Sequence, residues 1–454
     1  MPRARRYALV FAAIAPLAVA GCGTDGPVDA ISNLNPFKQE EQKVPGNRRS
    51  VLEGADPVAA VTGKPAVIGA PTALSGWPQP GGNAANDPGN VAAGSAGGSA
   101  WSTDAGRASA SGTFGFSSSA GIRVSARPVA AGGVVYSYDP EGNVTATAAS
   151  NGGRVFRVNV RPQGEGDAVN GGGVAVDGGR VYAATGFGEV VALDAGSGGV
   201  VWRAKLDAPA RGAPTAAAGK VVAVTQAGTV FALDAATGAK AWTASSDGSG
   251  AGLLGTSSPA VAGNLVIAPT NSGAILALDL ASGAEKWRGT VTGGSRIDAV
   301  TGLRDASASP VVHAGVVYAT GVGGRLVALK ADTGEVVWDQ AIGSAHTPVV
   351  SGEAVFLVDL SDRLVAFDRT RGTVLWATQL PSASGKRRVT WAGPLLANGR
   401  LWAVSVDGKI ASVDARDGSS GPVGAIGLEG AIAPIAVDGR IVVLGGDGRL
   451  TALN

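Results

Sequence analysis

One short pattern recurs along this chain and constrains its fold more than any other feature. It begins with Ala-Leu-Asp or a close variant, passes through a polar segment that often contains Thr-Gly, and ends at a tryptophan ten residues after the alanine. Because a repeated layout indicates one supersecondary unit used many times, we expect an array of similar units. Complete copies cover residues 192–202, 232–242, 277–287, 328–338 and 366–376, and weaker copies start at Ala146, Ser412 and Ala452.

Two further landmarks keep the same register in the eight copies. A glycine stands four residues before the first residue of seven copies, and Asp362 takes its place in the sixth. A proline stands fourteen residues before that position in every copy except the second, which has Val174. Each unit reads as four short strands joined by Gly-containing turns, and successive copies lie 38 to 51 residues apart. Such units have the size of propeller blades, so we predict an all-β, eight-bladed β-propeller over residues 100–454.

The repeated tryptophans are interpreted as structural. A tryptophan is large enough to cover the gap between neighbouring blades, and its N–H can reach a backbone group there. Ordinary packing within one blade is the alternative, and it is equally structural. These residues are Trp202, Trp242, Trp287, Trp338 and Trp376.

The last copy stops at Asn454, before a fourth strand and its tryptophan. A ring of blades cannot close around an open strand edge. The sequence Ser-Ala-Trp-Ser at residues 99–102 is the nearest upstream candidate for the missing strand. We therefore predict that Trp101 lies on a strand that completes the eighth blade and joins the two ends of the chain.

The first residues have the composition of an export signal. Three arginines lie within residues 1–6, and an apolar stretch of fourteen residues follows, too short to span a bilayer core of roughly 30 Å. The signal ends at Val19-Ala20-Gly21-Cys22, which resembles the lipobox of bacterial lipoproteins. We predict a signal peptide over residues 1–21 and a lipid on Cys22, the only cysteine of the chain. Gly23 after that cysteine favours the outer membrane, by resemblance to enterobacterial sorting.

Residues 22–99 have the composition of a linker. The segment is rich in Gly, Ala, Pro and Asn, and residues 94–99 have only small side chains. We expect the lipidated cysteine to be followed by a flexible tether, with two candidate ordered islands at residues 49–52 and 77–83.

Composition excludes several classes of function. One cysteine and two histidines leave little for a cysteine–zinc site, a Cys–His catalytic pair or a disulfide framework. The formal charge of +2 offers no basic surface for nucleic acid. Three of the 37 basic residues lie in the predicted signal, so the mature chain has 34 basic and 35 acidic residues. The two histidines, His313 and His346, are expected in loops rather than as ligands.

The Ala-Leu-Asp-x-x-Thr-Gly-x-x-x-Trp repeat resembles the blade motif of the quinoprotein-like (PQQ-like repeat) propellers. With the lipobox and eight blades, residues 100–454 resemble the BamB family, lipoproteins of the outer-membrane β-barrel assembly (BAM) machinery. Residues 77–83 are similar to the pre-propeller stretch of alphaproteobacterial members. The resemblance implies a non-enzymatic scaffold without cofactor or metal. It also implies binding to the periplasmic POTRA domains of BamA and to other subunits, and help in delivering unfolded outer-membrane proteins.

The same resemblance implies the residues that bind the partner. The family's arginine loop matches residues 210–214, which gives Arg211. Its acidic loop matches the region before Pro310, which gives Asp305 and, more weakly, Asp298. The family has leucines beside the arginine where this chain has Ala208 and Ala210. From the residues alone, Arg211 is as readily a solvated loop charge.

Two other functions stay open. The fold also carries pyrroloquinoline-quinone dehydrogenases, which by resemblance need adjacent cysteines and clustered calcium-binding acids. The recurring aspartates of this chain hold one repeat position and are interpreted as turn formers rather than as a single site. The second of these functions is that of a generic periplasmic propeller that binds glycans or peptides.

Overall fold

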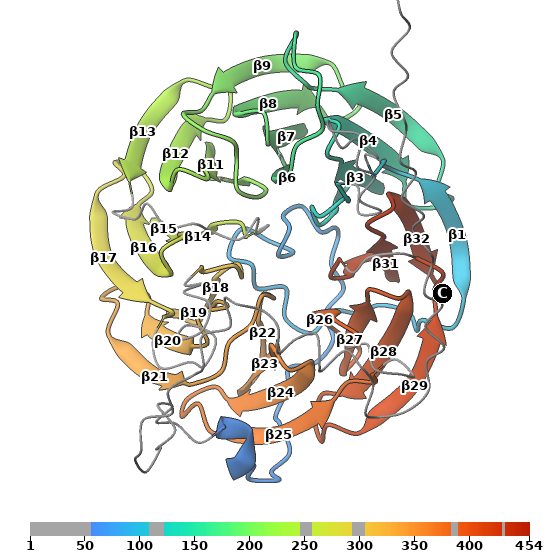
Figure 1. Ribbon diagram of the computed structural model, residues 1–454, viewed down its shortest axis with the longest axis vertical. Helices are drawn as coiled ribbons and strands as arrows, with labels where there is room; N and C mark the ends of the chain where they lie inside the picture. The colour runs from blue at the N-terminus through green and yellow to red at the C-terminus, as the bar shows by residue number, and fades with distance from the viewer. Residues whose placement is uncertain (1–55, 109–121, 246–256, 293–304, 383–388, 429–431) are drawn as a thin grey trace, which may run out of the picture. The chain divides into compact units, whose positions relative to one another are not determined.

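The computed structural model describes residues 56–108, 122–245, 257–292, 305–382, 389–428 and 432–454. These residues belong to one compact unit, Leu52–Asn454, and form eight four-stranded antiparallel sheets. Figure 1 shows the sheets as blades around a common centre, with the first strand of each blade innermost and the last at the rim. The predicted all-β, eight-bladed propeller is confirmed.

The blades follow the order of the repeats. Blade 1 consists of β2 (Val129–Ala131), β3 (Val134–Tyr138), β4 (Asn143–Ala148) and β5 (Arg154–Asn159), and blade 2 of β6 (Gly172–Asp177), β7 (Arg180–Thr185), β8 (Glu189–Asp194) and β9 (Val200–Lys205). Blade 3 consists of β10 (Thr215–Ala217), β11 (Lys220–Val224), β12 (Thr229–Asp234) and β13 (Lys240–Ser245), and blade 4 of β14 (Ala260–Ala262), β15 (Leu265–Pro269), β16 (Ala274–Asp279) and β17 (Glu285–Thr290). Blade 5 consists of β18 (Val311–His313), β19 (Val316–Thr320), β20 (Leu326–Lys330) and β21 (Val336–Gln340), and blade 6 of β22 (Val349–Ser351), β23 (Ala354–Val358), β24 (Arg363–Asp368) and β25 (Val374–Gln379). Blade 7 consists of β26 (Trp391–Ala397), β27 (Arg400–Ser405), β28 (Lys409–Asp414) and β29 (Ser420–Ala425). Blade 8 consists of β30 (Ile435–Val437), β31 (Arg440–Leu444), β32 (Arg449–Leu453) and β1 (Ser99–Asp104).

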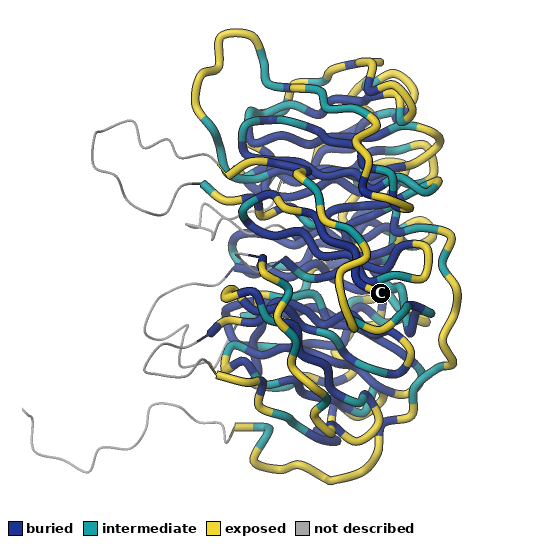
Figure 2. The backbone as a smooth tube through the Cα atoms, turned by 90° about the vertical axis from the view of Figure 1, so that its right-hand side faces the viewer, coloured by how far each residue is buried: buried dark blue, intermediate teal, exposed yellow. Residues whose placement is uncertain are grey.

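The core lies in the second and third strands of each blade. In β8, four consecutive residues are buried, because neighbouring blades cover both faces of the sheet. The rim strand β9 buries Trp202 but leaves its first two residues exposed. Figure 2 shows buried chain through the interior of the unit and exposed chain at its margins.

The repeated glycine before each third strand is required by its backbone. Gly188 and Gly228 have φ of 77° and 81°, in the left-handed region where a Cβ is costly. Asp362, the exception in the sixth copy, adopts φ of 59°. Aspartate is among the few residues that tolerate this region, which explains why it can replace glycine there.

Neighbouring blades are joined by the tryptophan of one and a turn glycine of the next. Trp287 Nε1 donates to Ala331 O at 2.8 Å, and its ring lies so close to Gly334 that an added Cβ would be 2.7 Å from it. The predicted contact across the gap is thus confirmed for Trp202, Trp242, Trp287 and Trp338. Trp376 packs in the same way on Gly418, but its indole N–H has no hydrogen-bond partner among the described residues.

The ring closes as predicted. β1 pairs antiparallel with β32, and Trp101 lies opposite Ala452. Trp101 Nε1 donates to Ala149 O of blade 1 at 2.9 Å, and the ring packs on Gly152. The strand that precedes blade 1 in the sequence therefore completes blade 8, and its tryptophan makes the joint to blade 1.

Residues 56–98, which we call the N-terminal strap, correct one prediction. They begin at the rim of blade 6 beside β25 and then follow the hairpin ends and inner edges of the blades, and Figure 1 shows this later part in blue inside the ring. Trp77 is fully buried and exchanges two backbone hydrogen bonds of 2.7 Å with Ala130 of β2. Further strap residues form hydrogen bonds with each of blades 2 to 8. Their partners are Val176, Ala216, Val261, Val312, Glu353, Leu396 and Gly439.

The prediction of a flexible tether is therefore wrong for this part of residues 22–99, and the expected island at residues 77–83 is confirmed as ordered. Innermost strands expose an unpaired edge to the channel, and the strap accepts hydrogen bonds from N–H groups of β2, β6, β10, β14 and β18. The predicted signal peptide, Cys22 and the island at residues 49–52 lie outside the described residues. Within the described ranges, no helix is long and apolar enough to span a membrane.

A first prediction concerns the closing strand. Trp101→Ala should lower the free energy of unfolding by about 3 kcal/mol, because it removes a large ring from the joint between blades 8 and 1. Trp101→Phe keeps an aromatic ring and loses only the hydrogen bond to Ala149, for about 1 kcal/mol. Urea unfolding followed by fluorescence measures both. An unchanged midpoint for the alanine variant would contradict the role of Trp101 in closure.

Candidate functional site

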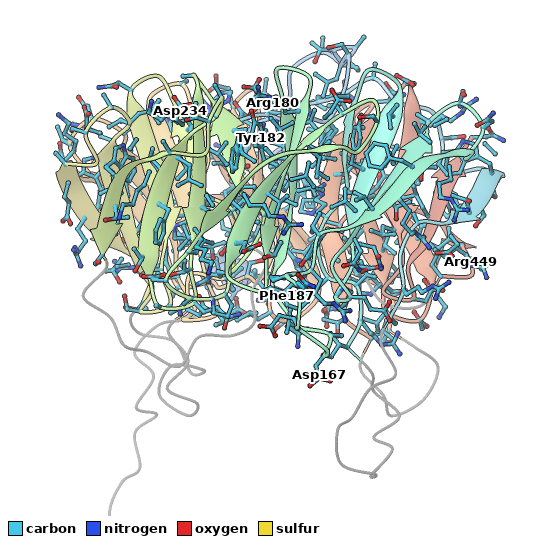
Figure 3. The ribbon with its side chains drawn as sticks, turned by 90° about the horizontal axis from the view of Figure 1, so that it is seen from above. Asp167, Arg180, Tyr182, Phe187, Asp234 and Arg449 are labelled. Carbon is cyan, nitrogen blue, oxygen red and sulfur yellow. The ribbon has the colours of Figure 1, made fainter. Side chains whose placement is uncertain are left out.

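The propeller has two faces that differ in their connections. The hairpin face carries the turns between the third and fourth strands, and Figure 3 shows Asp234 and Arg180 there. The interblade face carries the segments that lead from one blade to the next, and Figure 3 shows Asp167 and Phe187 at this opposite side. Two of the residues predicted to bind a partner, Arg211 and Asp305, belong to interblade segments of the described chain.

A single guanidinium connects three blades beneath the interblade face. Arg211, in the segment leading into blade 3, donates from Nε to Ser257 Oγ of blade 4 at 3.0 Å and from Nη2 to Ala306 O of blade 5 at 2.9 Å. It also donates to Asn271 of blade 4 and forms an ion pair with Asp305. Asn271 in turn donates to Gln226 O of blade 3 at 2.8 Å.

Backbone hydrogen bonds fix the position of the Arg211 main chain on blade 3. Ala210 pairs with Thr225 as an extension of blade 3, and Arg211 N donates to Val224 O at 2.9 Å. Two glycines permit the close approach of the loops. A Cβ on Gly171 would lie 2.4 Å from Ala210 O, and one on Gly321 would lie 2.3 Å from Asp305 O. The interblade loops of blades 3 and 5 are thus held by backbone contacts before any side chain acts.

Arg211 and Asp305 are buried, with side chains 1% and 0% exposed. The structure brings together two of the three predicted residues, although they are 94 positions apart, and excludes the alternative of a solvated loop charge for Arg211. Asp298 lies outside the described residues. Because neither buried side chain reaches the surface in this conformation, their predicted role in partner binding can only be exerted through the loops they hold.

A second polar group at the same face was not predicted. Arg127 stacks over the ring of Trp77 at 5.0 Å, and its Nε donates to Ala433 O of the segment leading into blade 8 at 3.1 Å. Burial lowers the pKa of Arg127 to about 9. The only sequence signal was its place directly before the landmark Pro128.

Of the two histidines expected in loops, His346 lies in the segment between β21 and β22, as expected, whereas His313 is the last residue of strand β18. Burial lowers the pKa of His346 to about 4, so its imidazole is neutral at neutral pH. On the hairpin face, His313 Nδ1 lies 2.7 Å from Asp87 Oδ2 of the strap. Burial raises the pKa of Asp87, and its hydrogen bond to His313 partly opposes that shift.

The buried polar groups at the interblade face are ion pairs and amides, and they hold the loops in position. In the part of the chain that the structure describes, no three His, Cys, Asp or Glu residues are grouped so that they could hold a metal ion.

The repeat, the eight four-stranded blades and the closing strand define a β-propeller of the PQQ-like repeat class. The chain matches the family described as "Outer membrane protein assembly factor BamB" over residues 140–378 and 355–454. It belongs to that family.

Named relatives agree with this assignment. The chain is 35% identical over 226 residues to "Outer membrane protein assembly factor BamB" of Salmonella typhimurium, which is 48% of this chain and 57% of the relative. The same figures hold for the Escherichia coli K12 protein. The match thus spans little more than half the length of these curated relatives.

Among solved structures, BamB from Moraxella catarrhalis is similar with a TM-score of 0.60 and 23% identity, over 71% of this chain and 93% of that one. The quinohemoprotein alcohol dehydrogenase from Comamonas testosteroni has a TM-score of 0.63 and 18% identity, over 84% of this chain and 80% of that one. At these identities the likeness shows the fold alone.

A second prediction compares the buried Arg211–Asp305 pair with an exposed arginine in its contribution to stability. Arg211→Ala should destabilise the protein by about 3–5 kcal/mol, because the Asp305 carboxylate stays buried without its arginine. The double variant Arg211→Met, Asp305→Leu should be less destabilised than either single variant. Arg371→Ala, whose side chain is 76% exposed, is the control and should change stability by less than about 0.5 kcal/mol. Equal small effects for Arg211 and Arg371 in urea unfolding would contradict the buried arrangement.

A prediction for pH follows from His346. Its folded pKa of about 4 lies below the usual 6.5, so the unfolded chain binds a proton first as pH falls. Stability present above pH 6.5 should be lost progressively down to pH 4, by on the order of 1–3 kcal/mol from this residue. His346→Gln should flatten that part of the curve of unfolding free energy against pH. Parallel curves for the two proteins would contradict the lowered pKa.

Proposed function

We propose that this protein is a non-enzymatic scaffold lipoprotein of the outer-membrane β-barrel assembly machinery. In this role it binds the POTRA domains of BamA and assists the delivery and insertion of outer-membrane proteins. The observation that carries the proposal is membership of the BamB family over residues 140–454. The names of the curated relatives, which describe outer-membrane protein assembly factors, agree with it.

The interblade face is the proposed partner surface. The Arg211 guanidinium fixes the spacing of loops from blades 3, 4 and 5, since it bonds to acceptors in two neighbouring blades from its own place on blade 3. A partner would then contact a prearranged set of loops and lose little conformational entropy in ordering them. Arg211 and Asp305 are positioning residues in this proposal, and Asp298 is a candidate for direct contact.

Unfolded outer-membrane proteins are the proposed clients. Their strands alternate apolar and polar residues, so a site that reads main-chain groups accepts many sequences. Each blade ends in a rim strand with an outward edge, and such edges can add an extended chain.

The anchor and location are part of the proposal. A lipid on Cys22 would hold the protein at the periplasmic face of the outer membrane. The similarity of residues 77–83 to alphaproteobacterial members stays a prediction. Nothing beyond the common propeller fold favours a quinone-dependent dehydrogenase.

Recovery from mild detergent tests the proposal. The native lipoprotein, purified through a C-terminal tag, should bring down a large outer-membrane barrel with POTRA domains. Arg211→Lys, which keeps the charge but not the forked geometry, should recover at least about tenfold less. Arg371→Ala on the hairpin face should recover as much as the native protein. Absence of any such barrel, with a soluble ligand bound instead, would contradict the scaffold role.

A further inference from the structure

The start of the strap docks on the rim of blade 6. Thr62 N and Gly63 N donate to Val374 O and Leu375 O of β25, each at 3.0 Å. The strap there includes η1 (Pro57–Ala60), a short 3-10 helix that Figure 1 shows lying outside β25. From Asp56 to Thr62 the strap passes from the end of β25 to its start, since Asp56 pairs with Arg363, which lies opposite Gln379. The chain thus carries an example of a segment bound to a blade's outer edge.

This docked segment covers an apolar pair at the start of the rim strand. Val374 and Leu375 are 3% and 6% exposed. Val58 packs against the cluster that contains Val374, and Ile68 packs against the one that contains Leu375. The acid at the head of the segment is held by charge, because Asp56 accepts from Arg363 at 2.5 and 3.2 Å.

The same apolar pair recurs on two other blades, where no segment of the described residues covers it. Counted from the repeat tryptophan, Val374–Leu375 corresponds to Val336–Val337 of blade 5 and Val200–Val201 of blade 2. Val336 and Val337 are 53% and 42% exposed, and the blade 2 pair is 48% and 46% exposed. The register shift opposite the pair recurs in all three blades, so the backbone is presented in the same way.

Charge distinguishes blade 5 from blade 2. Arg325 of blade 5 corresponds to Arg363, whereas blade 2 has Glu189 at that position. Arg363 holds two carboxylates, those of Asp56 and Asp359. Arg325 pairs with Asp339 at 2.7 Å and is 31% exposed, so it can receive a second carboxylate as Arg363 does. In blade 2 the pair is reversed, since Glu189 accepts from Arg203 at 2.9 Å, so an acidic residue at the position of Asp56 would meet a carboxylate rather than a guanidinium.

We propose that the outer edge of blade 5, formed by β21 with Arg325, is a docking site for an extended polypeptide of another molecule. Its ligand has the chemistry of residues 56–68: an acidic residue, then β-branched and small apolar residues. The main chain of the ligand bonds to the carbonyls of Val336 and Val337, and its apolar side chains cover the two valines. The site involves no interblade loop. It is one of the rim edges proposed above for client chains, but it is argued from the docked segment of blade 6 and would stand without binding to a POTRA domain.

A synthetic peptide of residues 56–68 tests the site on the full-length protein. The protein's own strap occupies blade 6 at an effective concentration of about millimolar, so the added peptide meets the uncovered edge of blade 5. Fluorescence anisotropy of the labelled peptide should show saturable binding below about 1 mM. Val336→Lys with Val337→Lys should weaken binding by about tenfold or more, and the matched pair Val200→Lys with Val201→Lys should leave it unchanged.

Two further measurements locate the ligand. Arg325→Glu leaves the valines in place. It should weaken the binding of the native peptide more than the binding of a peptide with Asp56→Ala. A photoreactive residue at the Val58 position should cross-link to residues 336–340. Cross-links to residues 374–379, absence of saturation, or equal binding to the blade 5 and blade 2 variants would each overturn the proposal. Circular dichroism confirms that each variant is folded.

Discussion

The contact between a blade's tryptophan and the next blade's turn glycine makes one ring from eight separate sheets. A four-stranded sheet of this size cannot bury both faces by itself. Trp242, for example, covers Gly283 of the following blade, where positive φ and the missing Cβ both require glycine. The tryptophan and the glycine of each joint therefore come from the same repeated motif, and each new blade completes the joint of the one before it.

Two joints depart from this rule. Between blades 1 and 2, Phe156 lies against Gly198 in place of a tryptophan, and between blades 7 and 8 the fourth strand of blade 8 is β1, which precedes blade 1 in the sequence. At the tryptophan position β29 has Pro422, and blade 8 has no Thr-Gly turn between β32 and β1. The end of the strap supplies other contacts instead. Val91 N donates to Leu396 O of blade 7 at 3.1 Å, and Gly94 N donates to Gly439 O of blade 8 at 2.5 Å. Closure thus depends on β1 and on the residues that lead into it.

Those leading residues also show the limit of what the sequence reveals. Repeats, strand order and the role of Trp101 were predictable, because each leaves a local signature at fixed spacing. The order of the strap was not, since small residues without periodicity are typical of flexible linkers and of chains packed tightly against other chains. Its partners lie far along the chain, as Val312 does from Ala85, so no local spacing reveals them. Trp77, in the expected island, was the one tryptophan of the strap that could indicate burial.

For the candidate site, the sequence indicated Arg211 and Asp305 through a family resemblance but could not indicate that they meet. Their pairing depends on how blades 3 and 5 are placed around the ring, which follows from geometry rather than from spacing. Gly171 and Gly321 were visible in the sequence, yet their need for close approach appears only once Ala210 and Asp305 are in place. Arg127 was missed for the same reason, since its partner Trp77 comes from the strap.

The two faces of the propeller are therefore organised by different means. At the hairpin face and along the inner strands, the protein's own N-terminal strap satisfies the free edges, so this side is already occupied by main chain. At the interblade face, buried polar side chains hold the loops while leaving the loop surfaces to solvent. A buried ion pair contributes little net stability compared with apolar packing. Its value here is geometric, because a guanidinium has fixed directions for its donors and sets the distances between three loops at once.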